Sequence, residues 1–482
     1  MLEDLSQERE AKVRRLRELG LDPYRGELPG IESLATVAAK YVEGGEPPAV
    51  TAAGRIVGGI RLHGKSAFFH LQDWTGRLQA YVRKDRLGDL GWEVFGLLDI
   101  GDIVGVAGAL QKTKTGELTI FADRLVPMSK ALLPLPEKWH GLTDVETRYR
   151  HRSLDLIANP EVLQRFLLRT RVVAGIRRFL EERGFVEVET PMMQAIPGGA
   201  AARPFVTHHN ALDLDLFLRI SPELYLKRLL VGGMERVFEI NRNFRNEGIS
   251  ATHSPEFTML EAYQAYSDLA GMMELAESMI VERVRTVSPT LRLPFGDATI
   301  DYTSPWARRS YGELLTEHAD LAIDDVAGAR ARARELGLEI KGHRDCDAVN
   351  TLFEALCEPT LVQPTFVYDY PAELCPLTRR RADHPKIAER FELYIGHMEI
   401  ANAYSELNDP LIQEALFREQ AGDEDSMVGR IDTAFLTAMR HGMPPAGGIG
   451  MGIDRVVMLL TDTHVMRDVV LFPLLRPAPE GE

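Results

Sequence analysis

Polar and apolar positions alternate with a period of two across residues 236–266, on both sides of a polar loop. This period predicts two β-strands. One face of each strand collects charged, amide and aromatic residues: Glu239, Asn241, Asn243 and Arg245 on the first, and Phe257, Met259, Glu261 and Tyr263 on the second. Such a grouping suits a sheet face that holds a charged ligand better than a solvated strand.

The run AGGIGMGIDRVVMLL at residues 446–460 predicts a glycine-rich strand that enters a helix, with Arg455 at the helix start. Glycines let the backbone approach a ligand closely, and planar guanidinium groups match phosphate oxygens. Arg245 and Arg455 would together clamp one polyphosphate. Without the glycines, Arg455 would be better explained as a solvated residue on the first turn of a helix.

Five short alternating runs predict a small closed β-barrel of the OB type: VTAAGRIVGGIRL, AFFHLQDW, RLQAYVR, DIVGVAGAL and LTIFADRLV. A basic amphipathic helix is predicted ahead of them, at residues 7–19. The closely spaced prolines of ALLPLPEKWHGLTD, which follows the barrel, predict an inter-domain linker.

The length of 482 residues indicates two or more domains, and the contents of 45% apolar and 26% charged residues are ordinary for a globular protein. No apolar run approaches the roughly 20 residues of a membrane span, and the start MLEDLSQEREAK is too acidic for a signal peptide. Cys346, Cys357 and Cys375 lack metal-ligand spacing, so we expect reduced buried thiols and a cytoplasmic location.

The net charge of −15 is unevenly spread along the chain. Residues 1–140 hold 19 Lys+Arg and 19 Asp+Glu, so the remaining residues, with 37 against 52, carry the whole excess. A neutral module can bind nucleic acid through a local patch, so the total charge does not exclude such a partner.

Two motifs are chance matches. GIRLHGKS at residues 59–66 fits the phosphate-loop pattern, but a strand-like run follows it where that loop needs a helix. A hairpin between barrel strands explains it better. HRDCDAVN at residues 343–350 fits the catalytic loop of protein kinases, but no DFG, VAIK-like or GxGxxG segment accompanies it.

Five long segments resemble the class II aminoacyl-tRNA synthetases, specifically the lysyl-tRNA synthetases of the bacterial type: RGFVEVETPMM (motif 1), PGGAAARPFVTHHNALDLDLFLRISPELYLKRL, FRNEGISATHSPEFT (motif 2), ERFELYIG with MEIANAYSELNDP, and GGIGMGIDR (motif 3). The resemblance covers nearly the whole chain and implies an α+β protein. Its expected parts are a helical extension at 1–48, an OB-fold anticodon-binding domain at 49–127, a linker at 128–145, and a catalytic domain at 146–482. That domain would hold an antiparallel sheet of six or seven strands flanked by helices, and motif 1 with Pro191 would form a homodimer.

The resemblance implies that a lysine carboxylate attacks the α-phosphate of ATP, giving lysyl-adenylate and pyrophosphate, before tRNA-Lys takes the lysyl group. An ionised nucleophile needs positioning and charge neutralisation more than a side-chain base. Arg245 would then contact the α-phosphate and the lysine carboxylate, Arg455 the γ-phosphate, and Phe257 the adenine, although a core position for Phe257 is equally compatible with the sequence. Further ATP contacts are implied for Glu247, His253, Ser254 and Glu392.

A lysine side chain is positively charged, so its pocket needs buried carboxylates to offset desolvation. Glu223, Glu261 and Glu406 match the glutamates of the lysine enzymes. The other residues of the implied lysine pocket are Gly199, Arg245, Tyr263, Asn402 and Tyr404. Ser221-Pro222-Glu223 also suits a helix start, a role worth only about 1 kcal/mol that does not exclude substrate contact. Three acids favour lysine over the aspartate or asparagine of related synthetases.

ATP requires a divalent cation, and Glu392 and Glu399 would bind Mg²⁺ together with phosphate oxygens. Gly396-His397 would turn a hairpin that pairs Tyr394 with Glu399. On a regular strand Glu399 and Glu406 would point in opposite directions. The sequence therefore predicts a bulge or twist between residues 399 and 406.

Four barrel residues resemble the family's anticodon-reading positions: Arg61, Phe68, Gln79 and Glu117. Of the neighbours Phe68 and Phe69, only one would point outward. Two alternatives to a lysine–tRNA ligase remain. A paralog that lysylates elongation factor P resembles only the catalytic part, which the barrel argues against. A non-catalytic relative would have lost the phosphate arginines or the metal acids.

Overall fold

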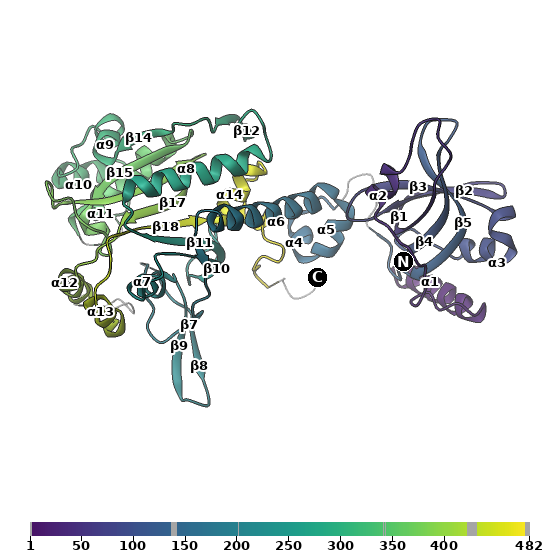
Figure 1. Ribbon diagram of the computed structural model, residues 1–482, viewed down its shortest axis with the longest axis horizontal. Helices are drawn as coiled ribbons and strands as arrows, with labels where there is room; N and C mark the ends of the chain where they lie inside the picture. The colour runs from purple at the N-terminus through teal and green to yellow at the C-terminus, as the bar shows by residue number, and fades with distance from the viewer. Residues whose placement is uncertain are drawn as a thin grey trace. The chain divides into compact units, whose positions relative to one another are not determined.

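The computed structural model describes residues 2–135, 142–200, 202–340, 342, 344–421 and 431–477. The chain divides into two compact units, Met1–Leu163 and Gln164–Glu482 (Figure 1). Part of the expected linker, residues 136–141, lies outside the described residues, so the expected linker and domain bounds stay predictions. Within the described chain, no helix combines the length and the apolar character needed to span a membrane.

The first unit is built on a closed barrel whose five strands follow the order β1-β2-β3-β5-β4 (Figure 1). Alternate residues point inward, and Phe69, Val82 and Ile120 are buried in the barrel core. Its strands and helices are α1 (Leu2–Glu18), α2 (Leu34–Ala39), β1 (Ala49–His63), β2 (Ser66–Gln72), β3 (Arg77–Arg83), α3 (Lys84–Gly96), β4 (Ile103–Lys112), β5 (Leu118–Ser129), α4 (Val145–Arg150) and α5 (Arg152–Ala158). The predicted barrel and N-terminal helix are thereby confirmed.

The hairpin predicted for GIRLHGKS is confirmed. His63 pairs with Ser66 at the tip of the β1–β2 hairpin, where Gly64 takes a φ of 62° that favours glycine. GIRLHGKS is therefore a hairpin, without the helix that a phosphate loop needs. The kinase-like run lies mostly on helix α11 (Asp345–Leu352), whereas its His343 lies outside the described residues.

The second unit is organised by an eight-stranded sheet in the order β14-β15-β16-β17-β18-β11-β10-β6. The six strands from β15 to β10 run antiparallel, while the edge strands β14 and β6 pair in parallel. The sheet strands are β6 (Val186–Glu187), β10 (Arg236–Phe244), β11 (Glu256–Ala265), β14 (Ala307–Ser310), β15 (Thr365–Pro371), β16 (Ile387–Ile395), β17 (Met398–Ser405) and β18 (Ala446–Gly452). The expected antiparallel sheet of six or seven strands is thus present as a core of six antiparallel strands, and two short edge strands that pair in parallel bring the total to eight.

Smaller elements complete this unit. They are α6 (Pro160–Glu181), which begins before the unit boundary, β7 (Met193–Gln194), β8 (Val206–His209), β9 (Leu214–Leu218), α7 (Glu223–Val231), α8 (Leu269–Arg285), β12 (Arg292–Phe295), β13 (Ala298–Asp301), α9 (Tyr311–Ala319), α10 (Val326–Glu335), α11, the turns η1 (Phe353–Cys357), η2 (Glu358–Thr360), η3 (Ala372–Leu374) and η4 (Met466–Asp468), α12 (Pro410–Ala421), α13 (Thr433–Arg440) and α14 (Ile453–Leu460).

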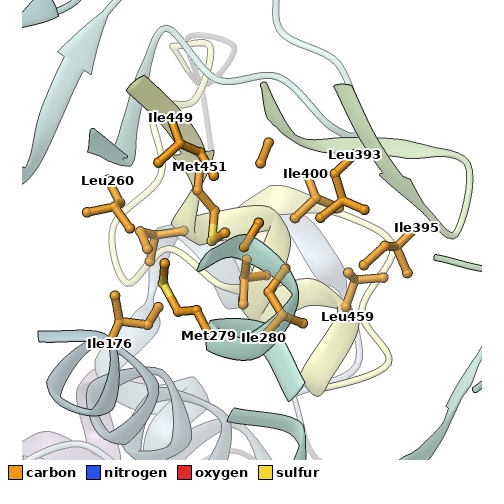
Figure 2. Close-up of a cluster of buried hydrophobic side chains, with 14 of the residues drawn as sticks. Ile176, Leu260, Met279, Ile280, Leu393, Ile395, Ile400, Ile449, Met451 and Leu459 are labelled. Carbon is orange, nitrogen blue, oxygen red and sulfur yellow. The ribbon is translucent and has the colours of Figure 1, made fainter. Parts of the chain in front are cut away.

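One face of the eight-stranded sheet is apolar and is covered by α6, α8 and α14. Figure 2 shows Ile176, Met279 and Leu459 of these helices opposite the strand residues Leu260, Ile400 and Met451. The buried area is the main source of stability here, because removing apolar surface from water yields about 25 cal/mol per Å². Side chains alternate between the two faces of a strand. The neighbours of these apolar residues along each strand therefore point to the opposite face of the sheet, which carries the polar groups.

The predicted hairpin and bulge are both present between β16 and β17. Tyr394 pairs with Glu399 around the Gly396-His397 turn, where both turn residues have positive φ. The register then shifts, since Leu393 pairs with Ala401 and leaves Ile400 as an extra residue. Ile400 and Ala401 both enter the apolar core. The extra residue of this bulge shifts the alternation of side chains by one position. Glu399 therefore lies on the same face as Asn402 and Glu406.

Candidate functional site

The polar face of the sheet forms the floor of a cavity of about 1040 Å³ in the second unit. Nine of the predicted site residues line it: Gly199, Glu223, Arg245, Glu261, Tyr263, Glu392, Glu399, Asn402 and Tyr404. They come from strands β11, β16 and β17 and from the segments beside them. The end near α7 is acidic and deeply buried, whereas Arg245 lies with Glu392 and Glu399 at the other end. Four further predicted residues are not among those that line the cavity: His253, Phe257, Glu406 and Arg455.

Glu261 is the central carboxylate of the acidic end, and 4% of it is exposed. It accepts hydrogen bonds from the hydroxyls of Ser221 (2.8 Å) and Tyr263 (3.1 Å). Burial raises the pKa of Glu261 to about 7, and the nearby Glu223 adds to this effect. A positively charged ligand would reverse the shift and favour the ionised form.

A second buried group joins α7 to the end of β17. Lys227 donates to Glu223 Oε1 at 2.6 Å and lies 2.5 Å from Glu406 Oε2, and its own side chain is fully buried. Burial opposes its charge, yet the two carboxylates hold the pKa of Lys227 above its ordinary value. Burial also raises the pKa of Glu406 despite this ammonium. Apart from Lys227, neither oxygen of Glu406 has a hydrogen-bond partner among the described residues.

Two glycines make room at this end. A Cβ on Gly448 would collide with Glu406 Oε1 and would lie 2.5 Å from the Tyr263 ring. Gly199 has a φ of 85°, and a Cβ there would lie 2.9 Å from that of Glu223. Both positions therefore require glycine for the close approach of acids and backbone.

The start of α7 differs in detail from the expected helix cap. The helix begins at Glu223, so Pro222 occupies the cap position and not the first helical turn. The Ser221 hydroxyl accepts from the Glu223 backbone N–H at 3.1 Å and donates to Glu261. Ser221 thus orders the helix start and a site carboxylate at once.

At the other end, Arg245 follows β10 and lies over the ring of Phe257, with 5.1 Å from its guanidinium carbon to the ring centroid. Its Nε has no hydrogen-bond partner among the described residues. Phe257 packs against the apolar core while its ring faces the guanidinium. Glu247 and Ser254 lie on the loop at residues 245–255, outside the residues that line the cavity.

Arg455 stands on the first turn of α14, as the glycine-rich run predicted. It donates to the backbone carbonyl of Glu399, lies 3.7 Å from that carboxylate, and is within 3.2 Å of His253 Nε2. Partial burial and the charge of Arg455 lower the pKa of His253. The ring is therefore held as a neutral imidazole beside the guanidinium.

Glu392 and Glu399 lie on the same face of the neighbouring strands β16 and β17, where Glu392 pairs with Asn402 and Glu399 with Tyr394. Glu392 accepts from the hydroxyls of Tyr370 (2.8 Å) and Tyr394 (2.6 Å), and burial raises its pKa. Burial acts on Glu399 as well, but Arg455 and the amide of Asn402, 3.0 Å away, hold its pKa below the ordinary value.

This donor set fits a hard divalent cation that takes its remaining ligands from a nucleotide. Carboxylate oxygens are the ligands that Mg²⁺ prefers, and phosphate and water complete its shell. Within the described residues no group of three or more His, Cys, Asp or Glu could hold a metal ion. The chain itself would thus supply two carboxylates, Glu392 and Glu399.

Sequence reasoning missed two buried cations of the site. Lys227 lies four residues after Glu223 on α7, a spacing that predicts an ion pair on a helix. The spacing does not predict that this ion pair is buried. Arg390 lines the cavity, donates to Glu392 and lies over the ring of Tyr404 at 5.6 Å. Its position two residues before Glu392 on the same strand face was the only available signal.

In the barrel, the four predicted anticodon residues lie on strands β1 to β3 and at the start of β5. Arg61 pairs with Phe68, whose ring stacks on Tyr81 at 4.3 Å, whereas Phe69 is in the core. Gln79 donates to the exposed Glu117 at 2.7 Å. Phe68 is therefore the outward-facing member of its pair, and the role of all four residues stays a prediction.

Comparisons with known proteins agree with this geometry. Residues 144–476 match the family model of class II tRNA synthetases (D, K and N), and residues 50–128 match that of the OB-fold nucleic acid binding domain. The lysine–tRNA ligase of Pelotomaculum thermopropionicum is 50% identical, over 99% of this chain and 96% of that protein. That of Carboxydothermus hydrogenoformans is 49% identical over 99% of both. That of Cronobacter sakazakii is 51% identical over 86% of this chain and 84% of its own.

Proposed function

This chain belongs to the class II lysyl-tRNA synthetases, and we propose that it forms lysyl-adenylate from lysine and ATP before it transfers the lysyl group to tRNA-Lys. Pyrophosphate would leave in the first step and AMP in the second. The observation that carries the proposal is one cavity with buried carboxylates at one end and arginines with two further acids at the other.

The acidic end suits the side chain of lysine. Glu223 and Glu261 line the cavity and would offset the desolvation of the ε-ammonium, with the Tyr263 hydroxyl as a further partner. Glu406 Oε1 lies against Gly448, in the space that a Cβ there would take, and its free acceptor capacity suits the same cation. An aspartate or asparagine would bring a carboxylate or a neutral amide to Glu261, whose bonds to Ser221 and Tyr263 supply no positive charge, so the pocket would reject them.

The arginine end suits ATP. Arg245 lies beside the cavity floor, and its unpartnered Nε and remaining N–H groups would hold the α-phosphate and the lysine carboxylate together. Arg455, with His253, would hold the terminal phosphate, and Phe257 would stack on the adenine. Glu392 and Glu399 would bind Mg²⁺. When bound, this ion would neutralise phosphate charge and orient the polyphosphate.

The barrel, residues 49–127, would read the anticodon through Arg61, Phe68, Gln79 and Glu117. Support comes from the half-buried, stacked ring of Phe68 and the hydrogen-bonded pair of Gln79 and Glu117. The domain bounds 1–48, 49–127, 128–145 and 146–482 belong to the same proposal, and the cytoplasmic location stays a prediction.

A homodimer through motif 1 is also proposed. Large apolar side chains are exposed on this segment and on the neighbouring β8–β9 hairpin: Val186, Met193, Val206, Leu212 and Leu214. A second copy would cover these exposed apolar side chains. Sedimentation that finds a fully active monomer would contradict this part.

Lysine-dependent ATP–pyrophosphate exchange, followed by charging of tRNA-Lys, tests the function. We expect both activities from the purified chain, with no exchange when aspartate or asparagine replaces lysine. Exchange without tRNA charging would instead favour the paralog that modifies elongation factor P. Absence of exchange would favour a binding protein.

A further inference from the structure

The acidic end of the cavity contains a cation that belongs to the chain itself. Lys227 projects from the first turns of α7, where its ammonium lies between Glu223 and Glu406, and its side chain has no exposed surface. Neither Lys227 nor Glu406 lines the cavity, whereas Glu223 and Glu261 do. The ammonium therefore lies behind the wall that a ligand would touch.

The position of Lys227 changes the charge balance of the pocket. Three buried carboxylates, Glu223, Glu261 and Glu406, converge on this end, and Lys227 contacts two of them. Without a cation, neighbouring buried acids take up protons, because burial and like charge both disfavour ionisation. A protonated carboxyl group loses acceptor capacity toward an ammonium ligand. A resident cation avoids that loss.

We propose that Lys227 is a positioning residue of the amino-acid pocket, which fixes Glu223 and Glu406 in place and supplies them with a buried counter-charge before the cationic substrate arrives. This inference rests on the proposed lysine substrate and deepens it. Lys227 itself touches neither substrate nor ATP. Because Lys227 acts through the two acids, its replacement should change the affinity for lysine.

Several other groups face this pair and would take part in its titration. They are Glu261 and Tyr263 on β11 and Tyr404 on β17, whereas Arg219 and Arg390 act one step further out, on Glu261 and on Tyr404 respectively. Burial raises the pKa of Glu406 even beside Lys227, so the loss of the ammonium would raise it further. Lysine binding would then have to displace additional protons.

Lys227→Met tests the proposal. We expect the KM for lysine at pH 7 to rise about tenfold or more, while the KM for ATP changes less than about threefold. Calorimetric titration with lysine in buffers of different ionisation enthalpy should show about one more proton released per lysine bound than in the wild type. Because proton release favours binding at higher pH, the loss of lysine affinity in Lys227→Met should become smaller between pH 6.5 and 8.5. Lys227→Arg should restore most of the affinity and the wild-type proton count.

Arg152→Met provides a control matched for burial. The Arg152–Asp155 pair is fully buried in the first unit, and neither residue lines the cavity. Its loss should lower the unfolding temperature without changing the ratio of the two KM values or the proton count. If Lys227→Met does not fold, Lys227→Gln, which keeps hydrogen-bond donors without the charge, takes its place.

Equal losses toward lysine and ATP, or an unchanged proton count, would overturn the proposal. Failure of both neutral variants to fold would also overturn it, since the cation would then serve the fold. A wild-type chain without lysine-dependent exchange would count against the proposed function instead.

Discussion

The two ends of the cavity differ in how deeply their charged side chains are buried. At the lysine end, Glu223, Glu261 and Glu406 are almost fully buried and already have internal partners, including the ammonium of Lys227. At the nucleotide end, Arg455 and Glu399 keep 18% and 36% of their side chains exposed. Both ends thus contain ion pairs of the chain's own, but those of the lysine end are buried, whereas Arg455 and Glu399 stay partly exposed to solvent and to the ligands.

The difference follows from the size and hydration of the two ligands. A single ammonium group must be stripped of water, so its acceptors have to be fixed in advance to repay the desolvation. A polyphosphate with its metal ion carries several charges and brings water and ligands of its own. The lysine end should therefore couple substrate binding to stability and protonation, whereas the nucleotide end should act on the rate alone.

Arg245→Ala gives the sharpest test of the nucleotide end. We expect kcat/KM for lysine-dependent exchange to fall about 10³-fold, the scale of removing a preorganised donor to developing charge. The unfolding temperature should stay within a few degrees, because Arg245 Nε has no partner among the described residues to lose. Steady-state exchange and thermal denaturation measure the two effects.

Arg245→Lys is the matched control, since it keeps the charge without the planar fork. It should recover only part of the activity. A loss of less than about tenfold in Arg245→Ala would show that this end does not depend on the arginine.

Glu261→Gln tests the lysine end with nearly unchanged shape. Loss of a buried carboxylate opposite an ammonium costs about 3 kcal/mol, or roughly 10²-fold in affinity. We expect the KM for lysine to rise by this factor while the KM for ATP changes less than about threefold. Lysine-dependent ATP–pyrophosphate exchange gives both KM values and shows which end of the cavity the substitution affects. A similar rise in both would mean that Glu261 supports the sheet and not the substrate.

Gly448→Ala changes packing without removing a charge. The new Cβ would displace Glu406 and the Tyr263 ring, and overpacking of this kind costs about 1–3 kcal/mol. We expect a KM for lysine about tenfold higher and a lower unfolding temperature. Gly59→Ala is the control, because a Cβ there meets nothing within 4 Å. An unchanged KM for lysine in Gly448→Ala would show that lysine binding does not depend on the observed position of Glu406.

The sequence was sufficient for most of the sheet because local rules agree there. The β16–β17 bulge could be predicted because Glu399 and Glu406 have opposite parity, and an extra core residue, Ile400, resolves the conflict. The barrel followed from five alternating runs. The parallel edge strands β6 and β14 could not be predicted, since strands of two and four residues carry too short a pattern.

The buried cations show where sequence reasoning ends. A Glu–Lys pair spaced by four residues usually lies on a solvated helix face, and only the three-dimensional position of Glu406 turns Lys227 inward. Glu239 gives the converse case. It belongs to the polar strand face, yet Arg219 at 2.6 Å neutralises it internally. Residue type and parity thus locate a polar face, whereas long-range neighbours decide which of its charges remain for a ligand.

The pH dependence of lysine binding should show the smallest effect and still separate the two ends. The pKa of Glu261 rises from 4.5 to about 7 in the folded chain, so this carboxyl binds its proton more tightly when folded. Its contribution to stability is present below about pH 4.5 and is lost as the pH rises toward 7, by roughly 3 kcal/mol. Lysine reverses this loss by pairing with the ionised form. The increase in unfolding temperature produced by a fixed lysine concentration should therefore grow between pH 6 and 8, and it should not grow in Glu261→Gln. The increase produced by ATP in the absence of lysine should lack this component, and an equal growth for both ligands would contradict the assignment of Glu261 to the lysine end.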